Sequence, residues 1–196
     1  MKTIYLAGGC FWGLQKFLDQ FAGVVSTETG YANGHTAHPS YEDVRYKLTG
    51  HTEIVKITYD ETVLPTQKLL GYFFMAIDPL SVNKQGEDEG INYRTGIYYD
   101  DASLGKDVEA AYQEEEKKAG QKLAVEVGPL ENFYSAEEYH QKYLDKHPDG
   151  YCHISAALLN LRKTLEAAAK EQAGEKDAAA QAGGKAEPTG KKEETT

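Results

Sequence analysis

A cysteine near the start of the chain lies between glycines and aromatic residues. Residues 8–13 read GGCFWG, so Cys10 follows two glycines and precedes Phe11 and Trp12. A cysteine that ionises to the thiolate is a nucleophile and a redox centre, and two aromatic side chains can wall a small apolar pocket beside its sulfur. The clustering predicts a reactive thiol. The alternative, from these residues alone, is a buried core cysteine with Trp12 as a packing residue.

The flanking residues predict that Cys10 begins a helix. Residues 3–7 form an apolar run typical of a strand, and apolar residues from Trp12 to Phe21 recur at helical spacing. Cys10 therefore falls at a strand-to-helix turn, where backbone N–H groups and the helix dipole favour the thiolate. We also expect the two glycines to let a substrate approach the backbone closely.

Three further stretches carry residue types suited to chemistry at a thiol. Glu53 either faces solvent from a half-buried strand or points into an apolar pocket, where burial would raise its pKa and keep it able to donate a proton. Residues 85–94 form an acidic surface loop, or a loop whose two glycines mimic a phosphate-binding loop. Against the second alternative, the three acids would repel phosphate, and the spacing fits no nucleotide-binding motif. Cys152 follows a Pro-Asp-Gly turn, so it is either mobile enough to reach Cys10 or a buried inert thiol.

Composition and charge argue against several classes of protein. The formal net charge of -10 disfavours nucleic acid and anionic membranes as partners. No apolar run approaches the roughly 20 residues of a membrane span, and the chain enters its first strand with no room for a signal peptide, so we expect a cytoplasmic protein. The two cysteines are too far apart in sequence to form a cysteine-pair zinc site, and the six histidines lack zinc-binding spacing. We expect no metal.

Strands and helices alternate irregularly along the chain. Beyond Cys10, the patterns predict strands within residues 23–31, 52–59, 93–99 and 122–127, helices within 41–44, 65–77, 103–119, 135–146 and 154–165, and a polar loop over 81–92. This order favours an α+β or mixed α/β sandwich over a doubly wound sheet. We expect residues 1–172 to form the catalytic domain. Residues 173–196, rich in Ala, Gly, Glu and Lys, predict a disordered tail.

Three motifs, in this order, resemble the signature of the A-type peptide methionine sulfoxide reductases. They are GCFWG at residues 9–13, TGHTE at 49–53 and QGxDxGxxYR at 85–94, where x is any residue. The resemblance covers about residues 3–155. It implies an α+β two-layer sandwich with a ferredoxin-like core, in which the catalytic cysteine begins the first helix.

The resemblance also implies roles for particular residues. Cys10 would be the nucleophile, Glu53 the acid that protonates the sulfoxide oxygen, and Cys152 the resolving cysteine. Phe11 and Trp12 would hold the ε-methyl group of the substrate. The residues implied to bind substrate are Phe11, Trp12, Tyr41, Asp88 and Tyr93.

The implied reaction reduces the S epimer of methionine sulfoxide, free or in proteins, and so repairs oxidative damage. A sulfoxide sulfur is a poor electrophile until its oxygen is protonated, so a neutral carboxylic acid is needed. Oxygen transfer leaves a sulfenic acid on Cys10, with which Cys152 condenses to a disulfide. Thioredoxin or a similar dithiol then reduces this disulfide. We expect a monomer that needs no cofactor.

The chain departs from the family pattern in a few places. Residues 45–48, RYKL, replace a stretch of small residues that often contains Cys and Gly, and Asn92 stands where Gln is common. We expect neither to touch the chemistry directly. A second recycling cysteine is absent, which leaves recycling to Cys152.

Two other classes remain open from the residues alone. One is a different thiol enzyme, such as a peroxide-reducing or redox-sensing protein, and the other is a non-enzymatic binding module. Reduction of methionine sulfoxide with dithiothreitol, and little activity on hydrogen peroxide, would separate these classes from a sulfoxide reductase.

Overall fold

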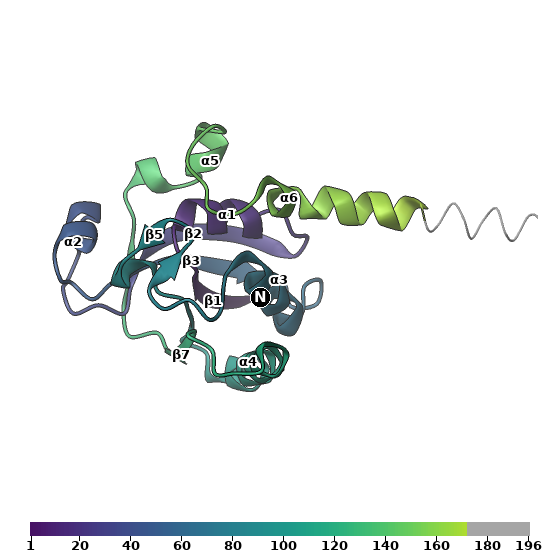
Figure 1. The fold of residues 1–196 in the computed structure, drawn as a ribbon, viewed down its shortest axis with the longest axis horizontal. Helices are drawn as coiled ribbons and strands as arrows, with labels where there is room; N and C mark the ends of the chain where they lie inside the picture. The colour runs from purple at the N-terminus through teal and green to yellow at the C-terminus, as the bar shows by residue number, and fades with distance from the viewer. Residues whose placement is uncertain (172–196) are drawn as a thin grey trace, which may run out of the picture. The chain divides into compact units, whose positions relative to one another are not determined.

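A six-stranded mixed sheet lies at the centre of residues 1–159 in the computed structural model, which describes residues 1–171 (Figure 1). Its strand order is β7-β6-β1-β3-β2-β8, and only β6 and β7 run parallel. The strands are β1 (Lys2–Ala7), β2 (Val24–Ala32), β3 (Thr52–Tyr59), β6 (Gly96–Tyr99), β7 (Glu126–Pro129) and β8 (Phe133–Ser135). The helices are α1 (Phe11–Leu18), α2 (Tyr41–Tyr46), α3 (Thr66–Ala76), α4 (Gly105–Ala119), α5 (Tyr143–Lys146) and α6 (Ala156–Leu159).

The four central strands have ferredoxin-like connectivity. The unit β1-α1-β2 is followed by β3-α3-β6, and the strands lie side by side in the order β6-β1-β3-β2, all antiparallel. The strands β7 and β8 extend this core at its two edges. The expected α+β class with a ferredoxin-like core is confirmed.

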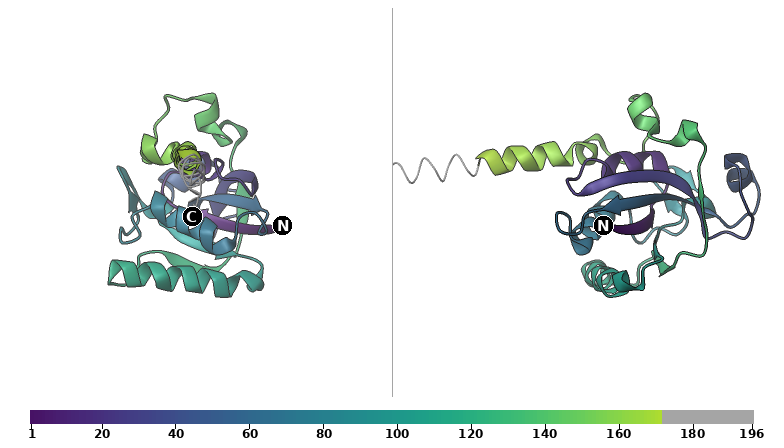
Figure 2. Two further views of the ribbon diagram at one scale, coloured as in Figure 1. Left: turned by 90° about the vertical axis from the view of Figure 1, so that its right-hand side faces the viewer. Right: turned by 180° about the vertical axis from the view of Figure 1, so that it is seen from behind.

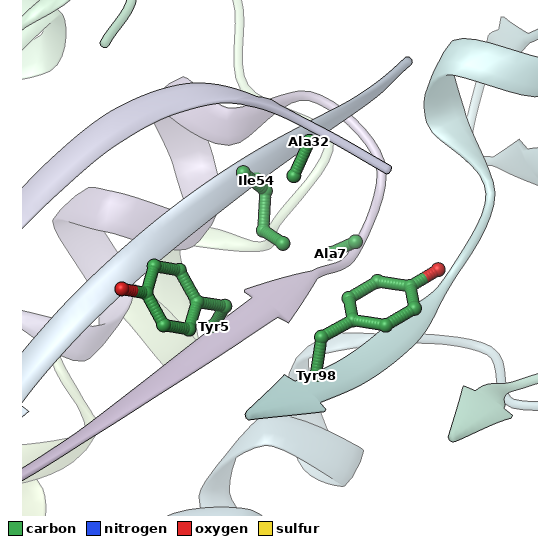
Figure 3. Packing of buried hydrophobic residues seen from close by; sticks show 5 residues of the cluster. All are labelled: Tyr5, Ala7, Ala32, Ile54 and Tyr98. Carbon is green, nitrogen blue, oxygen red and sulfur yellow. The ribbon is translucent and has the colours of Figure 1, made fainter. Parts of the chain in front are cut away.

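The two faces of the sheet are buried by different elements. Successive side chains of a strand point to opposite faces. Figure 3 shows one face, where β1, β2, β3 and β6 bring together Tyr5, Ala7, Ala32, Ile54 and Tyr98. Leu130 and Phe133 pack against this cluster. The opposite face carries the fully buried Ile4 and Leu6. There α1 contacts β2 and β3, and Thr66 at the start of α3 is hydrogen-bonded to Tyr59 of β3.

Local signals in the sequence place most of these elements correctly. Ser40 caps α2 with a reciprocal capping box to Asp43, which fixes the start of that short helix. Pro65 precedes α3, and α3 ends two residues before Asp78. The helix expected over residues 103–119 is α4, preceded by the 3₁₀ turn η2 (Ala102–Leu104). Figure 2 shows the length of α4, which packs against α3.

The helix expected over residues 135–146 is wrong. That segment contains the end of β8, the 3₁₀ turn η3 (Glu138–His140) and the four-residue α5. The side-chain amide of Gln141 accepts a hydrogen bond from the N–H of Thr29 and donates one to its carbonyl, both at 2.9 Å. Lys142 has a left-handed backbone with φ of 52°. These two residues tie the segment to β2 and interrupt any continuous helix.

Two further expectations are corrected in their details. Residues 81–92 are not only loop, because they contain a small hairpin of β4 (Lys84–Gln85) and β5 (Asp88–Glu89), followed by the 3₁₀ turn η1 (Ile91–Tyr93). The strands expected from residues 93 and 122 begin later, at Gly96 and Glu126.

The C-terminal part of the chain is described only to residue 171. The helix expected over residues 154–165 is interrupted, because α6 ends at Leu159, Asn160 is in a turn, and residues 161–171 form a separate helical stretch. A second compact unit begins at Asn160. The tail expected at residues 173–196 lies outside the described residues, and the domain boundary at 172 stays a prediction. Within residues 1–171, no helix combines the length and the apolar character needed to cross a membrane.

The contact between the end of β1 and α3 predicts a packing effect at Gly8. A Cβ atom there would lie 2.8 Å from Cγ2 of Ile77 and 3.2 Å from Cε2 of Phe73. Overpacking of this kind costs about 1–3 kcal/mol, so we expect Gly8→Ala to lower the free energy of unfolding by that amount in urea denaturation.

Gly128→Ala is the matched control, because a Cβ atom there meets nothing within 4 Å. Its free energy of unfolding should stay within about 0.5 kcal/mol of the unsubstituted protein. If Gly8→Ala and Gly128→Ala had equal midpoints and slopes in urea unfolding, α3 would not pack tightly on Gly8.

Candidate active site

A cavity of about 150 Å³ lies beside the N-terminus of α1. Seven of the eight site residues expected from the sequence line it, together with two that were not expected. The lining residues are Cys10, Phe11, Trp12, Tyr41, Arg45, Glu53, Asp88, Tyr93 and Tyr151. The structure therefore brings together residues from β3, α1, α2, the β4–β5 hairpin and the segment before α6.

Cys10 occupies the N-cap position of α1 and is 7% exposed. Burial raises the pKa of its thiol well above the ordinary value, and the negative charge of an ionised Glu53 raises it further. A hydrogen bond from the backbone N–H of Trp12 opposes these effects without cancelling them. The helix start favours the thiolate as expected, but burial has the larger effect and leaves the pKa of Cys10 raised.

Glu53 points from β3 toward the start of α1 and is 1% exposed. Its Oε2 accepts a hydrogen bond of 3.1 Å from the backbone N–H of Phe11. Burial raises the pKa of this carboxyl to about 8, although the Phe11 N–H stabilises the ionised form. Of the two alternatives left open by the sequence, the structure shows the buried carboxyl, and its raised pKa favours the protonated form at neutral pH.

The indole of Trp12 is held in place from two sides. Its ring stacks on Tyr143 with a centroid distance of 3.8 Å, and its Nε1 donates a hydrogen bond of 3.0 Å to Nδ1 of His140. Burial lowers the pKa of His140, which favours the neutral imidazole that can accept this bond. Phe11 is fully buried next to the same histidine, with ring centroids 5.1 Å apart.

Tyr41 and Tyr93 supply two hydroxyl groups to the cavity. Burial raises the pKa of both, so both remain protonated donors at neutral pH. Tyr41 is the first residue of α2, and its backbone N–H donates to the carboxylate of Glu137 at 2.8 Å. Its hydroxyl oxygen accepts a hydrogen bond of 3.1 Å from Arg45, which leaves the O–H free to donate.

Arg45 corrects a second expectation. Residues 45–48 were expected not to touch the chemistry, yet Arg45 lies in the cavity lining one helical turn after Tyr41. Its charge acts on the reacting groups, since it lowers the pKa of Tyr41 and of Glu53 against the larger effect of burial.

Cys152 lies next to the cavity but outside its lining. Its Sγ fills the space above Gly13 in the first turn of α1, where a Cβ atom would come within 2.8 Å of the sulfur. The sulfur is half-buried and donates to the carbonyl of Ile154 at 3.4 Å. Cys10 and Cys152 are both free thiols in this structure. The neighbouring Tyr151 reaches into the cavity, where its hydroxyl donates to Asp88 at 3.0 Å.

The glycines before Cys10 do not clear a path for substrate, contrary to expectation. Gly9 has φ of 78°, and a Cβ atom there would lie 2.6 Å from Cβ of Gln85. The space beside Gly8 is likewise filled by Ile77 and Phe73. These glycines allow the turn into α1 to pack against the rest of the protein.

Sequence reasoning missed four residues of the site. Arg45 and Tyr151 line the cavity, and His140 and Tyr143 hold Trp12. The adjacency of Tyr151 to Cys152, and the departure of Arg45 from the family pattern, were the signals available for two of them. Among residues 1–171, no group of three or more His, Cys, Asp or Glu side chains is arranged to hold a metal ion.

Comparison with known proteins identifies similar chains. The family model for peptide methionine sulfoxide reductase matches residues 2–173. The peptide methionine sulfoxide reductase MsrA of Lachnoclostridium phytofermentans is 52% identical over 162 residues, which cover 83% of this chain and 98% of that protein. The crystal structure of Mxr1 from Saccharomyces cerevisiae in reduced form has a TM-score of 0.74 and 35% identity, and the match covers 79% of this chain and 91% of that one. The crystal structure of Mxr1 from Saccharomyces cerevisiae in complex with Trx2 has a TM-score of 0.51 and 26% identity. That match covers 72% of this chain and 84% of the other.

The raised pKa of Glu53 predicts a pH dependence of stability. This carboxyl ionises near its ordinary value of 4.5 in the unfolded chain and near 8 in the folded protein. Between these values the folded state binds the extra proton, so the free energy of unfolding falls as the pH rises. From pH 5 to 8, the free energy of unfolding of the unsubstituted protein should fall by up to about 1.4 kcal/mol per pH unit relative to that of Glu53→Gln. Urea denaturation at each pH measures both.

Glu131→Gln, which removes an exposed carboxyl outside this cavity, is the control for the loss of one charge. In Glu131→Gln the free energy of unfolding should fall with pH as steeply as it does in the unsubstituted protein. A Glu53→Gln variant with that same slope would mean that Glu53 ionises normally in the folded protein.

Proposed function

This chain belongs to the peptide methionine sulfoxide reductase family and reduces methionine sulfoxide to methionine, and we propose that the cavity at the start of α1 is where it does so, with Cys10 as nucleophile. One observation carries this proposal. A buried carboxyl that stays protonated near neutral pH lines the same small cavity as the sulfur of Cys10. Sulfoxide reduction needs this pair, because the oxygen must be protonated while the sulfur is attacked.

The cavity has complementary sides for the two ends of the sulfoxide group. Phe11 and Trp12 give an apolar wall that suits the ε-methyl group. Glu53, Tyr41 and Tyr93 present hydrogen-bond donors that suit the sulfoxide oxygen. A methionine sulfoxide oriented between them places its sulfur toward Cys10.

The electrostatics of the pair favour a proton transfer that is coupled to attack. Burial is the largest contribution to both raised pKa values, and an ionised Glu53 raises the pKa of Cys10 further because two negative charges repel. A sulfoxide that takes the proton of Glu53 brings partial positive charge next to the sulfur of Cys10. This charge favours the thiolate at the moment when it is needed.

The first half-reaction transfers the sulfoxide oxygen to Cys10. Cys10 loses its proton and its sulfur bonds to the substrate sulfur, while Glu53 donates a proton to the sulfoxide oxygen. The oxygen then passes as hydroxyl to the sulfur of Cys10: the sulfur–oxygen bond of the substrate and the transient sulfur–sulfur bond break, which gives methionine and a Cys10 sulfenic acid. The sulfur of Cys10 is oxidised by two electrons, and the sulfoxide is reduced by two. The proton released by Cys10 restores the neutral Glu53.

The second half-reaction regenerates the thiol. We propose that the Cys152 thiol attacks the sulfenic sulfur, which releases water and forms a Cys10–Cys152 disulfide. The position of Cys152 above Gly13, at the first turn of α1, supports this role. An external dithiol then reduces the disulfide and is itself oxidised. The existence of an Mxr1 complex with Trx2 supports thioredoxin as that dithiol.

Three finer proposals complete this function. The substrate is the S epimer, because each sulfoxide reductase handles one epimer and this chain resembles the A-type enzymes. The catalytic domain spans residues 1–172, consistent with a family match that ends at residue 173. The enzyme works in the cytoplasm, where a reducing environment maintains the dithiol that the cycle consumes.

Cys10→Ser tests the assignment of the nucleophile. A serine hydroxyl does not accept the sulfoxide oxygen, so methionine formation from methionine sulfoxide with dithiothreitol should be abolished while circular dichroism shows a folded protein. Hydrogen peroxide as the alternative substrate should be consumed slowly by the unsubstituted enzyme. Sustained methionine production by Cys10→Ser would remove Cys10 from the mechanism.

Cys152→Ser tests the resolving step. It should still release close to one methionine per enzyme in the first turnover, and then stall with thioredoxin but continue with dithiothreitol, which attacks the sulfenic acid directly. Peptide mapping of the unsubstituted enzyme after one turnover without reductant should find the Cys10–Cys152 disulfide. A free Cys152 thiol beside an oxidised Cys10 would make this a one-cysteine enzyme.

A further inference from the structure

The guanidinium of Arg45 stands at the cavity without a carboxylate partner among residues 1–171. The other two arginines in this part of the chain form ion pairs, Arg94 with Glu126 and Arg162 with Glu166. The nearby Lys47 is paired with Asp43. Arg45 is therefore the one lining residue of the described cavity that offers an exposed, uncompensated positive charge.

Aromatic contacts hold the Arg45 side chain beside the cavity. Its Cζ lies 5.8 Å from the ring centroid of Tyr41 and 5.4 Å from that of Tyr46. One of its donors, on Nη1, is used by the hydroxyl of Tyr41. A guanidinium has five N–H donors in a planar fork, so the group keeps donors for a ligand.

The charges that surround Arg45 define what such a ligand can be. Glu53 is held neutral by burial, whereas the negative charge of Asp88, which accepts a hydrogen bond from Tyr151, raises the pKa of Glu53 and opposes a second anion beside it. The chain as a whole carries a net charge of -10, which offers an anion no long-range attraction. Solution salt screens charges beyond about 8 Å, so Arg45 can favour an anion only by direct contact at the cavity.

We propose that Arg45 binds a carboxylate of the substrate and makes this enzyme prefer methionine sulfoxide that carries or adjoins one. The planar fork of an arginine matches the two oxygens of a carboxylate. The carboxylate has two sources, the side chain of an acidic residue next to the sulfoxide in a protein and the α-carboxylate of free or C-terminal methionine sulfoxide. The proposal rests on the proposed function of the cavity and adds the class of substrate.

The competing interpretation is that Arg45 only supports Tyr41. Removal of the arginine would then lower the rate for every substrate by one factor, because the hydrogen bond to Tyr41 is lost in each case. A carboxylate-binding role instead changes the ratio of rates between substrates. The test therefore measures ratios of kcat/KM within pairs of substrates of equal size.

Two substrate pairs separate the two sources of the carboxylate. The first pair is acetyl-Gly-Met(O)-Glu-amide and its Gln analogue, which differ in a side-chain carboxylate. The second pair is acetyl-methionine sulfoxide and its methylamide, which differ in the α-carboxylate. The enzymes are the full chain, Arg45→Gln, Arg45→Lys and the control Lys47→Gln, which removes a neighbouring positive charge outside the cavity.

The expected result is a kcat/KM ratio of about two- to fivefold in favour of the acid in at least one pair, the size that an exposed ion pair supports. Arg45→Gln should bring that ratio to about one, Arg45→Lys should retain part of it, and 0.5 M salt should shrink it. Lys47→Gln should leave it as in the unsubstituted enzyme. The pair that responds identifies the source of the carboxylate.

Equal ratios in the unsubstituted enzyme and Arg45→Gln would overturn the proposal, and so would a uniform loss on all four substrates. The two neutral substrates distinguish a failure of the proposed function from a failure of the role proposed for Arg45. Failure of the unsubstituted enzyme to reduce the Gln peptide and the methylamide would count against the proposed function, whereas their reduction without discrimination would count against Arg45 alone.

Discussion

The hydrogen bond from the Phe11 N–H to the carboxyl of Glu53 is the contact on which the site depends. It joins the first residue of α1 to β3 and crosses the interface between the helix layer and the sheet. Because Glu53 is almost completely buried, its charge is costly, and the carboxyl keeps its proton to about pH 8. The hydrogen bond therefore fixes where the acid lies relative to the start of α1, whereas burial, against the effect of that bond, keeps the acid neutral.

The ferredoxin-like order of the sheet makes that contact possible. It places β3 between β1 and β2, and α1 connects those two strands. A residue of β3 on the helix-covered face therefore lies under α1. The same arrangement buries Cys10, so the sulfur of Cys10 and the carboxyl of Glu53 are both shielded from water. Burial raises the pKa of each, so each resists a negative charge.

Sequence patterns predicted what is determined locally. The strand 52–59, the capped start of α2 at Ser40 and the turn at Cys10 follow from alternation, capping chemistry and helical spacing. The structure of residues 135–146 was not predicted, because it depends on contacts of Gln141 with β2 and of Lys142 with α1. Helical propensity is a local property and carries no information about such contacts. The pKa of Cys10 and the placement of Arg45 were missed for the same reason. Burial and the docking of α2 arise only when distant segments pack.

The amide of Gln141 also has a consequence for the edge of the sheet. Strand β8 pairs with β2 from Gly30 to Ala32, and the N–H of Ala136 adds a hydrogen bond of 2.9 Å to the carbonyl of Thr29. Gln141 takes the N–H and carbonyl of Thr29, and the amide of Gln15 takes the carbonyl of Thr27. Open strand edges invite pairing with other chains, which leads to aggregation. Two glutamine side chains thus occupy backbone groups of β2 beyond the last residue paired with β8, and these groups are no longer available to a strand of another molecule.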